Sequence, residues 1–214
     1  MKIAFFGAGG KVGAAVVPAL QAAGHAVRPI AAGEASAVAG SDAAVDFTRP
    51  DAVEGNVRAA IDAGVPCVIG TTGFDTESVD AYAREAGVPC FFAPNFAIGA
   101  VLMMRLAAEA GKYLPRAEIV EGHHESKRDA PSGTAKATAA LLPGDPPIHS
   151  IRLPGLVAHQ EVLLGGDGQL LTIRHDAFSR EAYVPGVLLA LERVRDLAPG
   201  LTIGLDSLLE PPRP

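Results

Sequence analysis

The residues best suited to acid–base chemistry lie in one short stretch, Glu121–Ala135, which reads Glu-Gly-His-His-Glu-Ser-Lys-Arg-Asp-Ala-Pro-Ser-Gly-Thr-Ala. Two adjacent histidines, His123 and His124, are followed closely by Lys127. Histidine changes its charge near neutral pH, so it can hold or release a proton under the conditions in which most enzymes work. A lysine can bind an anionic substrate or donate a proton. We therefore take His123 and Lys127 as the candidate acid–base groups.

The neighbouring elements indicate how this stretch is positioned. The apolar run Ala117–Val120 predicts a strand and Ala135–Leu142 predicts a helix, so the stretch is expected to be a strand-to-helix loop. Ser132, Gly133 and Thr134 open the predicted helix. A helix N-terminus presents unpaired N–H groups and partial positive charge, so it can bind a carboxylate or a phosphate. Cations at one end of the stretch and a helix start at the other suit a small dicarboxylate.

A metal site and a plain surface loop are the alternatives for this stretch. Metal-binding groups are present on Glu121, His123, His124 and Glu125, but they lack the His-Glu-x-x-His pattern of a zinc-binding helix. A further ligand would have to come from another histidine, such as His159 or His175. We favour the acid–base interpretation and expect no bound metal. A polar surface loop without chemistry is the simplest alternative.

A glycine-rich turn near the start of the chain has the spacing of a dinucleotide site. The apolar run Ile3–Phe6 predicts a strand buried on both faces, Lys11–Ala23 a helix, and Ala26–Ile30 a second strand, which together form a βαβ unit. The turn Gly7–Gly13 would let the backbone approach a pyrophosphate at the helix N-terminus. The alternative is a glycine-rich turn with no ligand. A P-loop is excluded because no Gly-Lys-Ser/Thr is present.

The ribose of such a cofactor needs further side chains. Glu34, after the second predicted strand, is the candidate to bind the ribose hydroxyls, although a solvated loop glutamate fits the same position. Lys11, inside the glycine turn, could bind a 2′-phosphate, and no arginine follows Glu34 to do so. NADH and NADPH therefore both stay open as the cofactor.

Strands and helices continue to alternate up to residue 96, which predicts an α/β fold with a Rossmann-like, doubly wound parallel sheet. The expected strands are Ala43–Phe47, Pro66–Ile69 and Cys90–Ala93, and the expected helices are Asp51–Ala63 and Thr76–Ala86. Ligands on such sheets bind beyond the carboxyl ends of the strands. The turns Gly7–Gly13, Gly70–Gly73 and Pro94–Phe96 all lie at such ends, which supports a nicotinamide-type site.

The pattern changes after residue 96, where a long helix, Ala97–Leu114, is expected to lead into a smaller α+β domain with an open mixed sheet. The expected strands of this domain are Ala117–Val120, Ile148–Leu153, Glu161–Leu164 and Leu170–His175. A helix from near Ser179 and the apolar segment Leu201–Leu205 then return the chain to the first domain, before the proline-rich end Pro211–Pro214. The predicted domains are a dinucleotide-binding domain, residues 1–96 and 181–214, and a substrate-binding domain, residues 97–180.

A reduced nicotinamide in the first domain and a proton donor in the second would make the protein a reductase of a polarised double bond, C=N or C=C. A related amino-acid dehydrogenase, such as an aspartate dehydrogenase, is the enzymatic alternative. A non-catalytic dinucleotide-sensing protein is the alternative from another class. The closely spaced proton donors argue against a sensor, which has no need of them.

Composition and charge narrow the class of protein further. The chain of 214 residues carries a formal net charge of -6, which argues against a nucleic-acid partner. It has no apolar run long enough to span a membrane, and its start does not resemble a signal peptide. Cys67 and Cys90 each end a Val-Pro-Cys triplet, and we expect both to be buried in adjacent strands, in a reducing compartment. The expected location is the cytoplasm.

The central stretch, Glu121-x-His-His-x-x-Lys-x-Asp-Ala-Pro-Ser-Gly-Thr-Ala135, resembles the signature of the 4-hydroxy-tetrahydrodipicolinate reductase (dihydrodipicolinate reductase) family of the lysine and diaminopimelate pathway. The likeness continues in the same order through Gly7–Gly13, Asp46–Pro50, Val68–Phe74 and Ala93–Phe96, and more weakly through His159 and Ile173–Arg180. It covers nearly the whole chain. The chain is shorter than typical members, mainly between Ile30 and Ala43 and around Leu142–Ile148.

The resemblance implies NAD(P)H-dependent reduction of 4-hydroxy-tetrahydrodipicolinate, a cyclic hydroxy-imine dicarboxylate, to tetrahydrodipicolinate with loss of water. His123 matches the family's proton donor or acceptor and Lys127 its second catalytic group, while His124, Gly133 and Thr134 match substrate-binding positions. The implied cofactor-binding residues are Gly7, Ala8, Gly9, Gly10, Lys11, Val12, Glu34, Gly70, Thr71, Thr72, Ala93, Pro94, Asn95 and Phe96. The resemblance also implies a homotetramer assembled through the sheets of the second domain, which adds oligomerisation to the role of residues 97–180.

Overall fold

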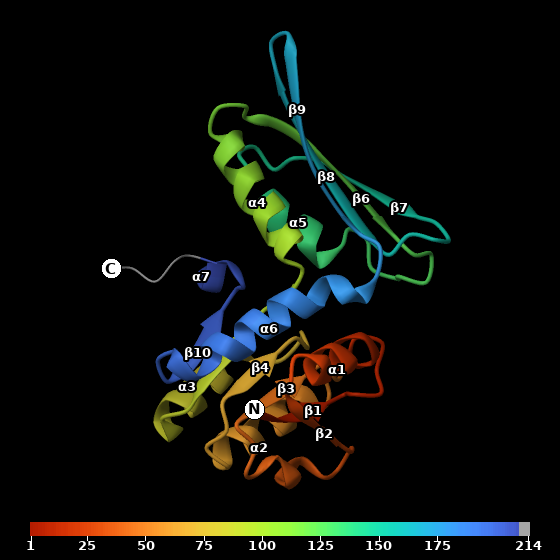
Figure 1. Cartoon of the computed structure of the whole chain (residues 1–214). Helices are drawn as coiled ribbons and strands as arrows, with labels where there is room; N and C mark the ends of the chain where they lie inside the picture. The colour runs from red at the N-terminus through yellow and green to blue at the C-terminus, as the bar shows by residue number, and fades with distance from the viewer. Residues whose placement is uncertain (210–214) are drawn as a thin grey trace. The chain divides into compact units, whose positions relative to one another are not determined.

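The computed structural model describes residues 1–209, which fall into two compact units, residues 1–96 with 183–209 and residues 97–182 (Figure 1). The proline-rich end predicted at Pro211–Pro214 lies outside the described residues. No helix among the described residues is long and apolar enough to cross a membrane.

A six-stranded sheet with the order β10-β5-β4-β3-β1-β2 forms the centre of the first unit. Its strands are β1 (Lys2–Phe6), β2 (Ala26–Ile30), β3 (Ala43–Asp46), β4 (Cys67–Ile69), β5 (Pro89–Phe92) and β10 (Gly200–Ile203). All neighbouring strands in this sheet run parallel. Because β10 pairs with β5, the end of the chain returns to the first sheet.

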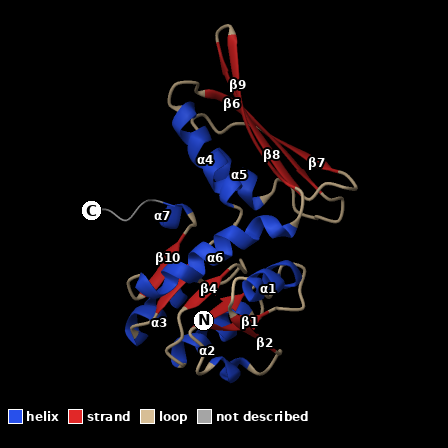
Figure 2. Ribbon diagram, in the orientation of Figure 1, coloured by secondary structure: helices blue, strands red, loops and turns tan. Residues whose placement is uncertain are grey.

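Helices cover both faces of this sheet (Figure 2). They are α1 (Gly13–Ala22), α2 (Val53–Asp62), α3 (Thr76–Ala86) and α6 (Val184–Arg193). The first unit also holds the short α7 (Asp206–Leu209) and the 3-10 turns η1 (Ala35–Val38) and η3 (Val194–Asp196), and the 3-10 turn η2 (Arg180–Tyr183) lies where the two units join in the chain. Ala4 and Phe6 pack in one core with residues of α2 and α3, whereas Ile3 and Phe5 point to the opposite face. All four are at most 2% exposed. The predicted Rossmann-like α/β sheet, with a first strand buried on both faces, is confirmed.

The chain changes direction across this sheet between β1 and β3. From β1 it moves to β2 at one edge, and from β3 it continues through β4 to β5 on the other side. Open α/β sheets bind their ligands at such a switch point, beyond the carboxyl ends of the strands. Gly7–Gly13 follows β1 at this point and Phe47 follows β3.

The second unit is a four-stranded mixed sheet with the order β7-β6-β8-β9 and two helices on one face (Figure 1). Its elements are α4 (Ile98–Gly111), β6 (Arg116–His123), α5 (Gly133–Ala140), β7 (Ile148–Arg152), β8 (Ala158–Gly166) and β9 (Gln169–Ala177). β6 pairs in parallel with β7, and the other two pairings are antiparallel. Met103 of α4 and Ala135 of α5 pack with Ile119 and Val162 of the sheet in one core. The predicted open mixed sheet is confirmed.

The prediction of a loop beginning at Glu121 was wrong. β6 continues through His123, so Glu121 and His123 are strand residues. β6 is hydrogen-bonded on both sides, and the pairing continues from Glu121, opposite Ser150 of β7, to His123, opposite Ala158 of β8. The polar residues after Val120 led to the prediction of a shorter strand. Hydrogen bonding to β7 and β8 on both edges extends β6 despite these polar side chains.

Cys67 and Cys90 are neighbours in the register of β4 and β5, and both are free and fully buried. The prediction that they lie buried in adjacent strands is confirmed. Burial raises the pKa of the Cys67 thiol and raises that of Cys90 to about 12. Both thiols are therefore protonated and unreactive near neutral pH.

We expect Gly186→Ala to destabilise the first unit. Gly186 lies within α6, where a Cβ atom would stand 2.1 Å from the Phe96 carbonyl oxygen and 3.0 Å from the Leu205 side chain. Backbone must move to relieve this contact, so the free energy of unfolding should fall by about 1–3 kcal/mol, although alanine is the better helix former. Denaturant titration followed by circular dichroism measures the change.

Gly55→Ala is the matched control for that substitution. Gly55 also lies within a helix, α2, but no atom stands within 4 Å of an added Cβ. Alanine should therefore raise the free energy of unfolding by about 0.5–1 kcal/mol. If the two substitutions changed stability equally, the close approach of α6 to Phe96 would be contradicted.

Candidate active site

His123 lies at the end of β6, on the same face of the strand as Glu121. Its Nδ1 is 2.5 Å from Oε2 of Glu121, whose side chain is fully buried. The His123 side chain keeps 17% of its surface exposed. A histidine that is held by a carboxylate at one ring nitrogen can exchange a proton through the other.

The Glu121 carboxylate joins three elements of the second unit. Arg152 of β7 donates from Nη1 to Oε2 at 3.0 Å and from Nη2 to Oε1 at 2.8 Å, and the Ser132 N–H donates to Oε1 at 3.3 Å. Burial by itself would raise the pKa of Glu121, but hydrogen bonds from Arg152, Ser150 and His123 lower it to about 2. The carboxylate is thus ionised at neutral pH and ties β6, β7 and the start of α5 together.

Burial lowers the pKa of His123 below its ordinary value. The Glu121 carboxylate opposes this effect because it stabilises the imidazolium, whereas the positive charges of Lys127 and Arg152 add to the lowering. His123 therefore responds to three neighbouring charges, and Lys127 lies near enough to influence its ring. A group whose protonation is balanced in this way suits general acid–base chemistry.

The loop after β6 places Lys127 and His124 beside polar partners. Lys127 Nζ lies 2.8 and 2.9 Å from the two carboxylate oxygens of Asp129, and this ion pair lowers the pKa of Asp129. The exposed His124 has its Nδ1 2.9 Å from the Ser126 hydroxyl. The structure thus places both predicted residues in the same loop, with Lys127 held by a carboxylate for which the sequence suggested no role.

Ser132 opens α5, as the sequence predicted. Its Oγ accepts a hydrogen bond from the Ala135 N–H at 3.2 Å, and Gly133 is the first helical residue. An added Cβ at Gly133 would meet no atom within 4 Å, so space is open beside the helix start. Gln160 of β8 donates to the Thr138 hydroxyl at 2.7 Å and anchors α5 to the sheet.

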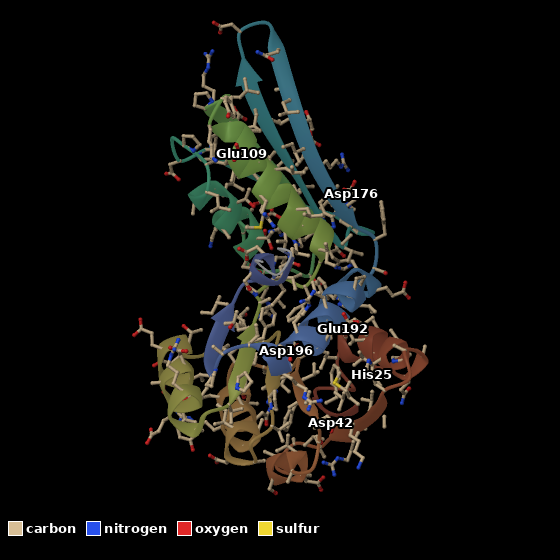
Figure 3. The ribbon with its side chains drawn as sticks, turned by 60° about the vertical axis from the view of Figure 1, so that its left-hand side comes forward. His25, Asp42, Glu109, Asp176, Glu192 and Asp196 are labelled. Atoms are coloured by element: carbon tan, nitrogen blue, oxygen red, sulfur yellow. The ribbon has the colours of Figure 1, made fainter. Side chains whose placement is uncertain are left out.

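The two other histidines considered as metal ligands have different partners. His159 Nδ1 lies 2.6 Å from Oδ1 of Asp176, which is labelled in Figure 3. His175 lies against Gly99 of α4, where an added Cβ would meet the ring at 2.5 Å, and burial lowers its pKa. Within residues 1–209, no group of three or more His, Cys, Asp or Glu side chains could hold a metal ion.

The glycine turn of the first unit needs glycine for two close approaches. At Gly7, where φ is +83°, a Cβ would stand 2.2 Å from the Phe47 carbonyl oxygen. At Gly13 it would stand 2.4 Å from the carbonyl oxygen of Gly7. Gly9 is exposed and has open space where a Cβ would lie, and the first turn of α1 has no acidic residue. The turn can therefore meet a pyrophosphate at the start of α1, as a dinucleotide requires.

Asp46, at the end of β3, is a fully buried carboxylate whose importance the sequence pattern did not indicate. Its Oδ1 accepts from the N–H and hydroxyl of Thr48 at 3.0 and 2.8 Å and from the Thr71 hydroxyl at 2.6 Å, while Oδ2 accepts from the Asn56 amide at 2.8 Å. These bonds join the turn after β3 to the turn after β4. In the sequence, the one indication of this role was a carboxylate residue at the end of an apolar run.

Phe47 extends this connection to the turn after β5. Its ring packs over Gly70, where a Cβ would stand 2.0 Å from a ring carbon, and its centroid is 5.4 Å from that of Phe96. The predicted cofactor residues after β4 and β5, Gly70–Thr72 and Ala93–Phe96, thus lie along one packed edge. Glu34, after β2, and Lys11, in the glycine turn, are exposed in the same unit.

Family models match nearly the whole chain. Residues 1–96 match the N-terminus of dihydrodipicolinate reductase, and residues 99–209 match its C-terminus. The 4-hydroxy-tetrahydrodipicolinate reductase of Mycobacterium marinum is 44% identical over 98% of this chain and 99% of its own length. That of Mycolicibacterium gilvum is 45% identical over the same shares. The alignment with the Mycobacterium marinum protein covers 243 positions, so this chain of 214 residues is the shorter of the two.

Solved structures give the same result. The dipicolinate-bound dihydrodipicolinate reductase from Paenisporosarcina sp. TG-14 has a TM-score of 0.83 and 32% identity, over 98% of this chain and 99% of that chain. An amine dehydrogenase from Mycobacterium smegmatis has a TM-score of 0.68 at 13% identity, so it shares the fold alone. The amino-acid dehydrogenase and sensor alternatives are therefore not favoured. Matches to both family models and to full-length relatives show that the chain belongs to the dihydrodipicolinate reductase (4-hydroxy-tetrahydrodipicolinate reductase) family, which uses a nicotinamide dinucleotide.

Proposed function

We propose that the chain reduces 4-hydroxy-tetrahydrodipicolinate to tetrahydrodipicolinate with NADH or NADPH, in lysine and diaminopimelate biosynthesis. The observation that carries the proposal is the grouping of His123, Lys127 and the start of α5 in one unit of a chain that matches this family along its length. The substrate gains a hydride and a proton and loses water, so the reaction needs a hydride donor, a proton donor and a site for two carboxylates.

The second unit offers groups for the dicarboxylate. We assign substrate binding to His124, Gly133 and Thr134, because an exposed imidazole and the first N–H groups of a helix both attract anions. Lys127 adds a full positive charge. Its Nζ is held by Asp129 in the structure, so a substrate carboxylate would compete with Asp129 for the same ammonium group.

His123 is the proposed proton donor. In its charged form it would give up a proton from Nε2 and return to the neutral imidazole, while Lys127 keeps the substrate's negative charge compensated. The nicotinamide, when bound, supplies the hydride. Residues Gly7–Val12, Glu34, Gly70–Thr72 and Ala93–Phe96 are the proposed cofactor contacts, with the backbone of the glycine turn meeting the pyrophosphate.

We also propose a role for each domain and a homotetrameric assembly. Nucleotide binding is assigned to residues 1–96 and 181–214, and substrate binding and oligomerisation to residues 97–180. On the face of the second sheet opposite α4 and α5, Ile151 and Leu170 are 41% and 67% exposed, which supports assembly of a homotetramer through this face. We propose a cytoplasmic location, in keeping with a biosynthetic reductase and with the two free cysteines.

A coupled assay tests the activity itself. Hydroxy-imine freshly formed from pyruvate and aspartate semialdehyde is added with NADH or NADPH, and loss of the reduced-nicotinamide absorbance is followed. Turnover that depends on the hydroxy-imine supports the proposal. Reduction of NAD+ with aspartate or another amino acid, without turnover of the hydroxy-imine, would support an amino-acid dehydrogenase instead. Cofactor binding without either reaction would support a sensor.

His123→Gln and Lys127→Ala are each expected to lower kcat by about a hundredfold or more, the size typical of positioned acid–base groups. Circular dichroism should show an intact fold in both variants, because neither side chain is part of a hydrophobic core. His25→Gln, at a half-buried histidine, and Lys112→Ala, at an exposed lysine, lie outside the proposed site, so they are the matched controls and should keep wild-type kcat. Near-wild-type turnover of both site variants would refute the assigned roles.

Lys11→Ala tests the contact with a 2′-phosphate. Loss of a charge-assisted hydrogen bond to phosphate should weaken NADPH binding about tenfold, while NADH binding stays within about twofold. Isothermal titration of each coenzyme measures the two dissociation constants, with Lys2→Ala as the control. An equal loss for both coenzymes would show that Lys11 acts on the shared pyrophosphate and not on the 2′-phosphate.

A further inference from the structure

We propose that Glu121, clamped by Arg152, is a positioning residue that fixes the ring orientation and the tautomer of His123, so that Nε2 is the nitrogen that exchanges the proton with substrate. This inference rests on the proposed function, because it takes His123 as the proton donor. It assigns roles to two residues that do not themselves contact the reacting atoms.

The geometry leaves the Glu121 carboxylate little freedom. Oε2 lies 2.5 Å from His123 Nδ1 and accepts from Arg152 Nη1 at 3.0 Å, while Oε1 accepts from Arg152 Nη2 at 2.8 Å and from the Ser132 N–H at 3.3 Å. The carboxylate and the guanidinium thus meet through two parallel hydrogen bonds, a geometry that fixes both groups. Rotation of the carboxylate would break several bonds to a fully buried charge.

The protonation of Glu121 determines the tautomer of His123. An ionised carboxylate only accepts hydrogen bonds, so the short contact at Nδ1 requires a proton on that nitrogen. In the neutral ring the lone pair is then on Nε2, and in the imidazolium Nε2 carries the proton that can leave. The hydrogen bond at Nδ1 also fixes the ring plane, which is the usual role of such a partner.

The charges around His123 come from three segments. Glu121 lies on the same strand, Arg152 on β7 and Lys127 on the following loop, where Asp129 pairs with Lys127. From β8 the register partner is the uncharged Ala158, and α5 contributes the Ser132 N–H to Glu121. Three charges act on the His123 ring. The negative charge of Glu121 favours the protonated ring, whereas the positive charges of Arg152 and Lys127 disfavour it.

Two substitutions should shift the titration of His123 in opposite directions. Glu121→Gln removes the stabilising negative charge, so the pKa of His123 should fall. Arg152→Met removes a repelling positive charge, so the pKa of His123 should rise. The acid must be protonated to act, so activity is lost as pH rises through its pKa. The alkaline limb of kcat/KM should therefore move to lower pH in Glu121→Gln and to higher pH in Arg152→Met.

The experiment follows His123 by NMR titration of the intact chain, together with the pH profile of turnover. Glu121→Gln should also lower kcat about tenfold or more near pH 8, with KM for the hydroxy-imine changed less than about threefold. Glu121→Asp keeps the charge and should restore the position of the alkaline limb. Glu118→Gln is the matched control, because Glu118 lies on the same strand and holds an exposed histidine, His149, at 2.8 Å. It should leave the titration of His123 unchanged.

The NMR titration separates this inference from the proposed function. If the chain does not turn over the hydroxy-imine, the proposed function fails, and the His123 titration still reports on Glu121. An unchanged His123 pKa in Glu121→Gln, or shifts of the same sign in Glu121→Gln and Arg152→Met, would overturn the positioning role. If Glu121→Gln does not fold, two other results test the positioning role. The pKa of His123 should rise in Arg152→Met, and the alkaline limb of Glu121→Asp should stay at its wild-type position.

Discussion

The pairing of the buried Glu121 carboxylate is the interaction that fixes the relative positions of β6, β7 and the start of α5 in the second unit. An ionised carboxylate inside a protein costs several kcal/mol unless its oxygens are paired. Arg152, the Ser132 N–H and the His123 ring satisfy it here, and they come from β7, the start of α5 and β6 itself. The strand, its neighbour and the helix start must therefore keep their mutual positions. One of the contacts that compensate the charge also holds the ring of His123.

The first unit also contains a buried carboxylate, that of Asp46, but its hydrogen-bond partners are of another kind. Asp46 is surrounded by neutral donors, namely hydroxyls, an amide and a backbone N–H. Neutral donors order the turns after β3 and β4 without placing a cation in that cluster. A rigid edge is useful at a switch point, because a dinucleotide is bound largely by backbone groups whose positions must be set in advance. In both units, a buried carboxylate at or near the end of a strand orders the segments beyond it.

Local sequence patterns were sufficient for much of the fold. The glycine turn, the alternating apolar runs and the Val-Pro-Cys triplets depend on residues close together in the chain. They predicted the parallel sheet and the burial of Cys67 and Cys90 in adjacent strands. The length of β6 could not be predicted, because it depends on pairing with β7 and β8. Arg152 was missed for the same reason, since it reaches Glu121 from 31 residues away, through the parallel register of β6 and β7. Asp46 was missed because two of its four donors, on Asn56 and Thr71, lie farther along the chain and reach it only on folding.

The position of β10 has a consequence for biosynthesis on the ribosome. β10 closes one edge of the first sheet beside β5, yet residues 200–203 are translated after the whole of the second unit, residues 97–182. A nascent chain that has emerged as far as β5 therefore exposes the hydrogen-bonding edge of that strand, and exposed strand edges promote association between chains. The second unit is continuous in sequence and can complete its sheet first. The first sheet therefore stays incomplete beside β5 until residues 200–203 have emerged, after the whole of the second unit.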